Sequence, residues 1–162
     1  MAISLKVKDN SKKVSGKFKS YQSALSRAID KGVKQAGFQL LDIIRTKTQK
    51  GIDFRDRDFA SYTEGYRKRL EREGKPTKVD LFYTGRMLGS LTPNSTVKKT
   101  GKHKVTLAFS NAQMRQRALF NQVLMGEKNR EFFGFNKRTE NIISKQFNRF
   151  VAKELRKFRI WV

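Results

Sequence analysis

Two long stretches of the chain place apolar side chains at the three- and four-residue spacing of an amphipathic helix. The first predicts a helix from Ser20 to about Gly51, and the second predicts a C-terminal helix that Asn136 caps. Gly32 and Gly37 fall inside the first helix, where each costs about 1 kcal/mol relative to alanine. They therefore indicate close approach by another element or another subunit. The two stripes are Tyr21, Leu25, Ala28, Ile29, Val33, Ala36, Leu40 and Ile44, then Ile142, Ile143, Phe147, Phe150, Val151 and Leu155.

Alternation of apolar and polar residues predicts strands in two other parts of the chain. Residues 2–8 alternate in this way, and a lysine-rich connector follows through Gly16. We therefore expect residues 1–19 to hold a strand and a mobile basic arm. Further along, strands near Thr92–Lys98 and Lys104–Phe109 flank a Thr-Gly turn, a pattern typical of a β-hairpin.

These elements predict one α+β domain over residues 1–162. A small antiparallel β-sheet is expected to pack against the long N-terminal helix and the C-terminal helix. The length fits one ordinary domain, which typically has about 100 to 200 residues. Residues 158–162 are expected to form a mobile tail.

Two shorter helices are predicted from their capping and apolar residues. The sequence Ser-Tyr-Thr-Glu at 61–64 matches a capping box for a short charged helix, which Gly-Lys-Pro at 74–76 ends. Residues 110–126 fit a second helix that ends at Gly126. Its apolar residues fall broadly on one side, and they are Met114, Ala118, Phe120 and Val123.

The segment Asp80–Leu91, DLFYTGRMLGSL, changes abruptly from charged residues to small and apolar ones. Thr84 is placed to cap a short turn of helix, and the spacing of Met87, Leu88 and Leu91 predicts that this turn is buried. We interpret the segment as a structural joint between the helices and the hairpin, not as an active site. Small residues would let the turn lie tightly against the long helix, and they are Gly85, Gly89 and Ser90.

Charge limits the classes of partner. The chain has 37 Lys and Arg against 14 Asp and Glu, a formal net charge of +23. Such a field attracts nucleic acid, anionic membranes or acidic protein surfaces, and charge alone does not choose among them. The absence of cysteine excludes disulfides, zinc–thiolate sites and cysteine nucleophiles. No apolar run is long enough for a signal peptide or a membrane span, so we expect a protein made in a cytoplasm, with no membrane partner.

Candidate catalytic and metal-binding residues are few. His103 lies in the predicted hairpin turn with no partner near it in the sequence, so we interpret it as an exposed turn residue. Asp53, Asp56 and Asp58 could gather around a hard cation, but arginines stand between them, which favours ion pairing within the loop. The sequence predicts no catalytic, cofactor or metal site, and we do not expect an enzyme.

An aromatic loop, Arg-Glu-Phe-Phe-Gly-Phe at 130–135, comes just before the predicted C-terminal helix. Its phenylalanines either staple that helix onto the sheet or, where they are exposed, form an interface with another molecule. Both interpretations stay open at this point.

The order of these segments resembles that of the virion-morphogenesis and tail-completion proteins of tailed bacteriophages. That family typically carries a Thr-Gly-x-Leu-like turn followed shortly by Ser, and later an Arg-x-Phe-aromatic-Gly motif just ahead of the last helix. The resemblance spans about residues 20–157. Here the matching residues are Thr84, Gly85, Met87, Leu88 and Ser90, then Arg130, Phe132, Phe133 and Gly134, with Phe135 adjoining them as a further interface candidate.

The resemblance implies a non-enzymatic structural protein of the virion. It would form a ring at the head-to-tail junction, as a neck, tail-completion or tail-terminator protein, with a hexamer favoured and a dodecamer as the alternative. Its partners would be neighbouring neck or adaptor and tail-tube proteins, with non-specific contact to DNA in transit and no cofactor. The location would be the virion, and the host cytoplasm during assembly.

Two other functions stay open from the residues themselves. Basic residues interleaved with aromatic ones could bind phosphates and stack on bases, so the chain could instead be a basic nucleic-acid-binding module. A small metal-dependent nuclease that uses Asp53, Asp56 and Asp58 is the third alternative.

Overall fold

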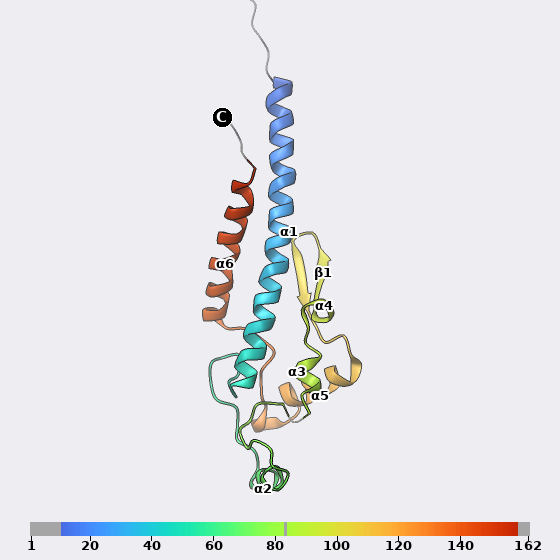
Figure 1. Ribbon diagram of the computed structural model, residues 1–162, viewed down its shortest axis with the longest axis vertical. Coiled ribbons are helices and arrows are strands. Elements are labelled where there is room, and N and C mark those ends of the chain that lie inside the picture. Colours follow the sequence, from blue (N-terminus) through green and yellow to red (C-terminus); the bar gives the residue numbers. More distant parts are fainter. Residues whose placement is uncertain (1–10, 83, 159–162) are drawn as a thin grey trace, which may run out of the picture.

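The computed structural model describes residues 11–82 and 84–158 (Figure 1). The strand predicted at residues 2–8, and the predicted tail beyond Phe158, lie outside the described residues. Within the described ranges, no helix carries an apolar stretch long enough to cross a bilayer. The elements in chain order are α1 (Ser11–Gln49), α2 (Glu64–Arg72), α3 (Arg86–Gly89), α4 (Pro93–Thr96), β1 (Val97–Gly101), β2 (Lys104–Leu107), α5 (Ala112–Val123), a 3-10 turn η1 (Gly126–Lys128) and α6 (Lys137–Arg156).

The predicted α+β class is confirmed, and α1 is its central element. α6 runs antiparallel along one side of α1, and the β1–β2 hairpin packs on another (Figure 1). The shorter helices α2, α3 and α5 gather toward the C-terminal end of α1 (Figure 1). One helix therefore carries both the second long helix and the sheet.

Two helices differ in length from their predictions. α1 begins at Ser11, not Ser20, and runs for 39 residues, so residues 11–19 are helical and do not form a mobile arm. Lysine favours helix nearly as well as alanine, and no proline interrupts this stretch, so the helix continues beyond its apolar stripe. α5 is shorter than predicted, because it ends at Val123 and Gly126 opens η1 with a φ of 59°.

Gly32 and Gly37 lie where neighbouring elements approach α1 closely, as the sequence predicts. A Cβ atom at Gly32 would lie 2.9 Å from the Phe147 ring of α6. At Gly37 a Cβ would lie 2.7 Å from Val97 Cγ1 of β1. Because the interior is closely packed, a larger side chain at either position would strain these contacts. The two glycines therefore determine how closely α6 and the hairpin approach α1.

The first strand begins later than predicted. Thr92 caps α4, and its side chain accepts a hydrogen bond from the backbone N–H of Ser95 at 3.2 Å. Pro93 then occupies the first helical turn, a position that needs no backbone donor. The residues expected to start the strand are therefore helical, and β1 starts at Val97.

The hairpin turn also falls elsewhere. β1 pairs antiparallel with β2, with Val97 opposite Leu107, and Lys102 and His103 form the connection instead of the expected Thr-Gly pair. His103 has a φ of 57°, a left-handed conformation that histidine adopts more readily than most residues.

One of the three predicted helix caps is correct. Asn136 caps α6 by accepting a hydrogen bond from the backbone N–H three residues on. The capping box before α2 is wrong, because that helix begins at Glu64, with Thr63 at its N-cap and no side-chain hydrogen bond. Thr84 does not cap α3, since Gly85 occupies the N-cap in a left-handed conformation.

The hydrophobic core lies where the C-terminal part of α1 meets α3, the hairpin and α5. Leu88 and Leu91 are fully buried there, which confirms the prediction for this turn. Gly89, by contrast, has open space around its Cα, so close packing does not require its small size. The other core residues are Leu41, Ile44, Phe59, Val79, Met87, Val97, Phe109, Met114, Ala118 and Phe132.

We expect Gly37→Val to lower the free energy of unfolding by about 1–3 kcal/mol, the usual range for overpacking a filled interface. The added side chain would meet Val97 and push the hairpin away from α1. Gly16→Val is the matched control, because a Cβ there meets nothing within 4 Å, and we expect a change of only a few tenths of a kcal/mol. Urea unfolding followed by circular dichroism measures both, and equal midpoints would contradict the close contact.

Candidate interaction cleft

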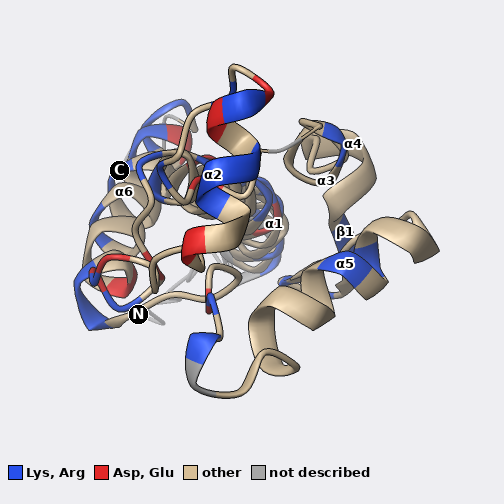
Figure 2. Cartoon of the chain, turned by 90° about the horizontal axis from the view of Figure 1, so that it is seen from below, with Lys and Arg blue, Asp and Glu red and all other residues tan. Residues whose placement is uncertain are grey.

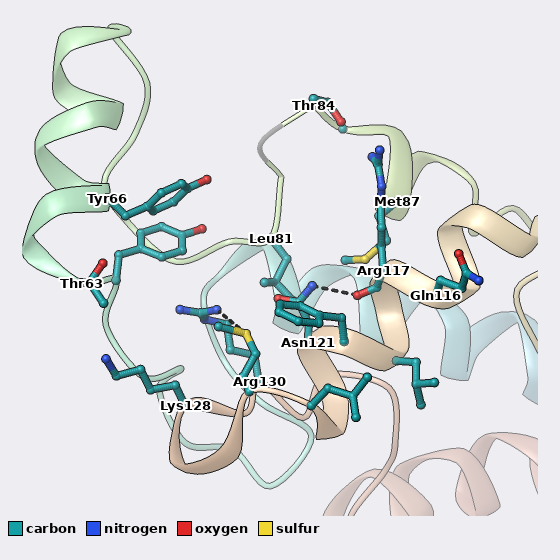
Figure 3. Close-up of a pocket in the computed structure, with 16 residues that line it drawn as sticks. Thr63, Tyr66, Leu81, Thr84, Met87, Gln116, Arg117, Asn121, Lys128 and Arg130 are labelled. Atoms are coloured by element: carbon teal, nitrogen blue, oxygen red, sulfur yellow. Dashed lines mark hydrogen bonds between the residues drawn. The ribbon is translucent and has the colours of Figure 1, made fainter.

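An open cleft of about 820 Å³ lies where α2, α5 and the segment before α3 meet (Figure 3). In Figure 3, Thr63 and Tyr66 stand on the α2 side, Gln116 and Arg117 on the α5 side, and Leu81 between them. Ligand sites in proteins typically measure about 300–1,000 Å³. The cleft is therefore large enough to receive part of another molecule.

α5 forms one wall because it is apolar on two sides. Met114 and Ala118 face inward and are buried in the core. Leu119, Phe120 and Leu124 point elsewhere, and they are 51%, 53% and 61% exposed. The prediction of one apolar side for this helix is therefore wrong, and its second apolar side borders the cleft.

A strained turn before α3 forms part of the opposite wall. Asp80 Oδ1 accepts a hydrogen bond from the backbone N–H of Phe82 at 2.9 Å, and Leu81 has a φ of 53°. A non-glycine residue held in such a conformation costs on the order of 1–3 kcal/mol, so the surrounding contacts must hold it there. Leu81 of this turn and Met87 of α3 both line the cleft.

Arg130 lies at the inner end of the cleft, and only 4% of its surface is exposed. Its backbone N–H donates to the carbonyl oxygen of Asn121 at 2.7 Å, which fixes it against α5. The guanidinium carbon lies 4.9 Å from the centre of the Tyr62 ring, and Nη1 lies 3.1 Å from the sulfur of Met125. Nε is buried without a hydrogen-bond partner.

The charge of Arg130 is poorly compensated within the subunit. No Asp or Glu of the described residues pairs with it, and burial lowers the pKa of Arg130 from its ordinary value. The Tyr62 ring supplies a cation–π contact, and Tyr66 packs edge-on against that ring at 4.8 Å. A buried charge is costly unless it is paired, so the arrangement favours a ligand that brings negative charge.

The remaining charged groups of the cleft have the same sign. Arg117 and Lys128 line it together with Arg130, and no Asp or Glu is among the described residues that line it. The rest of the lining is mainly apolar or aromatic. The cleft thus combines an apolar surface with three cations.

The structure brings four of the ten predicted interface residues together in this cleft. Thr84, Gly85, Met87 and Arg130 all line it. Thr84 and Gly85 come from the turn before α3, Met87 from α3 itself and Arg130 from the aromatic loop, so two motifs that are far apart in sequence line one cleft. Figure 3 shows Thr84, Met87 and Arg130 around it.

The other predicted residues of the two motifs have structural roles. Leu88 and Phe132 lie in the core. Ser90 Oγ donates a hydrogen bond to the carbonyl oxygen of Met87 at 2.7 Å, which closes the turn after α3.

Different residues of the aromatic loop fit the two interpretations that the sequence left open, packing within the chain and exposure for an interface. Phe132 and Phe133 pack against Phe109, which follows β2, with ring centres 6.4 Å and 5.4 Å away, so they act as a staple. A Cβ at Gly134 would lie 2.9 Å from the Phe54 ring, so this glycine allows close packing. Phe135 is 54% exposed and is available for an interface.

Sequence reasoning missed the aromatic and aliphatic walls of the cleft. Tyr62 precedes α2 and Tyr66 lies within it, in a segment whose sequence is dominated by charged residues. In α5 the adjacent pair Leu119 and Phe120 cannot share one helical side with Met114. Apolar residues that exceed one side of a short helix were the available signal of a second apolar surface.

The three loop aspartates do not converge on a common point. Asp53 accepts hydrogen bonds from two backbone N–H groups of its own loop and pairs with Arg57, as the ion-pairing interpretation predicts. Asp56 instead pairs with Lys47 of α1 at 2.6 Å, while Asp58 bridges Ile52 through the backbone. Over residues 11–82 and 84–158, no group of three or more His, Cys, Asp or Glu gathers as metal ligands would.

His103 is not the isolated, exposed turn residue that the sequence predicts. Its Nδ1 lies 3.1 Å from Asp30 Oδ1, and its backbone N–H donates to the same oxygen at 2.9 Å. Lys99 Nζ lies 2.6 Å from the other oxygen of this carboxylate. Lys99 first, then the His103 amide, lower the pKa of Asp30 to about 2. These contacts tie the hairpin turn to α1.

Comparison with protein-family models, curated proteins and solved structures found no match for this chain. The cleft, the exposed apolar side chains and the distribution of charge are therefore the features on which a function can be based.

We expect Arg130→Met to unfold at the same urea concentration as the wild type or a higher one. Methionine removes a buried charge that has no carboxylate partner among the described residues, and it thereby removes the desolvation cost of that charge. Arg57→Met is the control, since Arg57 pairs with the buried Asp53 and its loss should destabilise the loop. A decrease of more than about 2 kcal/mol for Arg130→Met would show that the fold requires this guanidinium.

Proposed function

We propose that this chain is a structural virion protein of a tailed bacteriophage or prophage, and that it assembles into a ring at the head-to-tail junction. The observation that carries the proposal is the apolar surface that a single subunit leaves uncovered along α6. A protein whose work is assembly needs such surfaces, and monomers rarely keep large ones exposed.

α6 has a wide apolar stripe, and among the described elements it packs mainly on α1. The contact with α1 at Gly32 reaches Phe147 and Val151, yet every apolar residue of the α6 stripe stays at least partly exposed. Ile142 is 42% exposed, and Phe135 just before the helix is 54% exposed. A second subunit would cover this side of α6, and repeating the same contact around an axis closes a ring.

The positive charge fits the same role. A strongly basic ring complements acidic surfaces on neighbouring neck, adaptor or tail-tube proteins, and it attracts DNA that passes through the junction. A neck, tail-completion or tail-terminator protein of this kind would form a hexamer, or alternatively a dodecamer, and reside in the virion.

We expect the wild-type protein to form closed rings in negative-stain images at high protein concentration. Ile142→Lys should give monomers with an unchanged unfolding midpoint, because this side chain is already exposed in one subunit and a charge opposes an apolar contact. Asn141→Lys is the control, since it adds the same charge at the preceding exposed position. Analytical ultracentrifugation measures all three, and a wild type that stays monomeric at every concentration would exclude the ring.

A second candidate, nucleic-acid binding, is favoured by one specific feature of α6. Lys145, Arg149, Lys153 and Arg156 recur every three or four residues, so they form one basic stripe on the exposed side of the helix. Figure 2 shows Lys and Arg residues of α6 in blue. Within the described part of the chain, these four form no ion pair. A line of unpaired cations suits a phosphate backbone.

Changing all four residues of the basic stripe to Gln tests this candidate. If the stripe binds duplex DNA, the slope of log K against log salt should become shallower by about 0.9 for each lost phosphate contact. Titrations by fluorescence anisotropy measure the slope, and recognition further requires a preference for one sequence or shape over bulk DNA. An unchanged slope, or equal binding to every DNA, would remove this candidate. The control changes four exposed lysines of α1 to Gln, namely Lys12, Lys17, Lys19 and Lys34.

A further inference from the structure

We propose that the cleft between α2 and α5 binds a short acidic and apolar peptide segment of a partner protein. A carboxylate of that segment would accept hydrogen bonds from the Arg130 guanidinium, and an adjacent large apolar side chain would pack on the exposed side of α5. This inference goes beyond the virion assignment and does not depend on it.

Arg130 carries the first part of the inference. Its side chain is almost fully buried, its Nε has no partner, and Nη1 contacts only the sulfur of Met125. A guanidinium presents several N–H donors in a planar fork that matches the two oxygens of a carboxylate. The structure therefore holds a preorganised donor whose natural acceptor is absent from the described residues.

The charged residues of the cleft indicate that the molecule bound there carries negative charge and is not a second copy of this chain. Arg117 and Lys128 line the cleft together with Arg130, and none of the described lining residues is acidic. Like charges facing one another across an interface cost several kcal/mol, so a basic segment is rejected. A second copy of this chain is a poor occupant for the same reason, since it carries 37 Lys and Arg against 14 Asp and Glu.

The apolar part of the cleft favours a peptide over a nucleic acid. Single-stranded nucleic acids stack their bases on free aromatic faces. Here Tyr62 is already occupied by the Arg130 guanidinium and by the edge contact with Tyr66. Phe120 is exposed in the cleft beside two aliphatic residues, Leu119 and Leu124, which offer no aromatic face to a base and suit an apolar side chain such as Leu or Phe.

A fluorescein-labelled peptide, Gly-Ser-Asp-Leu-Phe-Asp-Glu-Leu-Gly-Ser, provides the probe. One control peptide replaces Asp and Glu with Asn and Gln, and another replaces Leu and Phe with Ser. Fluorescence anisotropy is measured at about 0.3 M salt, which screens exposed charges beyond a few ångströms. We expect the acidic and apolar peptide to bind the full chain at least about tenfold more tightly than either control.

Variants of the protein then locate the site. Arg130→Met should abolish the preference for carboxylate over amide, and Arg130→Lys should weaken it because the planar fork is lost. Phe120→Ser should weaken binding about tenfold without unfolding the subunit, since Phe120 is 53% exposed. Two exposed residues away from the cleft provide matched controls, and Arg156→Gln and Phe18→Ser should both bind like the wild type.

Three results would overturn the proposal. The first is equal binding of the carboxylate and amide peptides, or a preference that survives both Arg130→Met and Arg130→Lys. The second is displacement of the peptide by a single-stranded oligonucleotide that binds the wild type but not Phe120→Ser, which would assign the cleft to nucleic acid. The third is self-association that only Phe120→Ser abolishes, which would assign the cleft to a second copy. Ring formation that fails while the peptide still binds would count against the virion assignment alone.

Discussion

The fold depends on one constraint, that α1 must be narrow enough to be packed closely on two sides. Gly32 admits Phe147 and Val151 of α6, and Gly37 admits Val97 and Val105 of the hairpin. Two glycines cost a helix about 2 kcal/mol relative to alanine, and burial of the neighbouring apolar side chains offsets this. A side chain at either position would push α6 or the hairpin away from α1 and weaken the packing that joins these elements.

The apolar stripes of the two long helices could be predicted from the three- and four-residue spacing of their side chains. The close contacts at the two glycines could be predicted because glycine destabilises a helix interior unless another element packs there. The N-cap of α6 by Asn136 was likewise predictable, as was the burial of Leu88 and Leu91. The ends of the helices and strands could not be predicted, because several neighbouring residues are each able to cap a helix or begin a strand. Ser61 and Thr63 both resemble caps, and only the surrounding backbone selects Thr63.

The cleft could be predicted only in part. Two short motifs pointed to Thr84, Gly85, Met87 and Arg130, but nothing in their spacing showed that they meet. Long-range contacts of this kind arise from the path of the whole chain, which no local pattern encodes. The partner of His103 was hidden for the same reason, since Asp30 lies 73 residues away along the chain.

The scarcity of acidic residues explains why the surface of this protein is so strongly positive. Several of the described acidic residues form ion pairs that join segments distant in the sequence. Glu154 holds Lys31 of α1 and Lys157, Asp30 holds the hairpin turn, and Asp56 holds Lys47. These contacts lower the pKa of all three carboxyls, so they stay ionised into the acid range. These acidic residues pair with other parts of the chain and not with the basic stripe of α6 or the cations of the cleft. The positive charge of both regions therefore remains available to a binding partner. Unpaired positive charge in both regions favours binding to acidic molecules over basic ones.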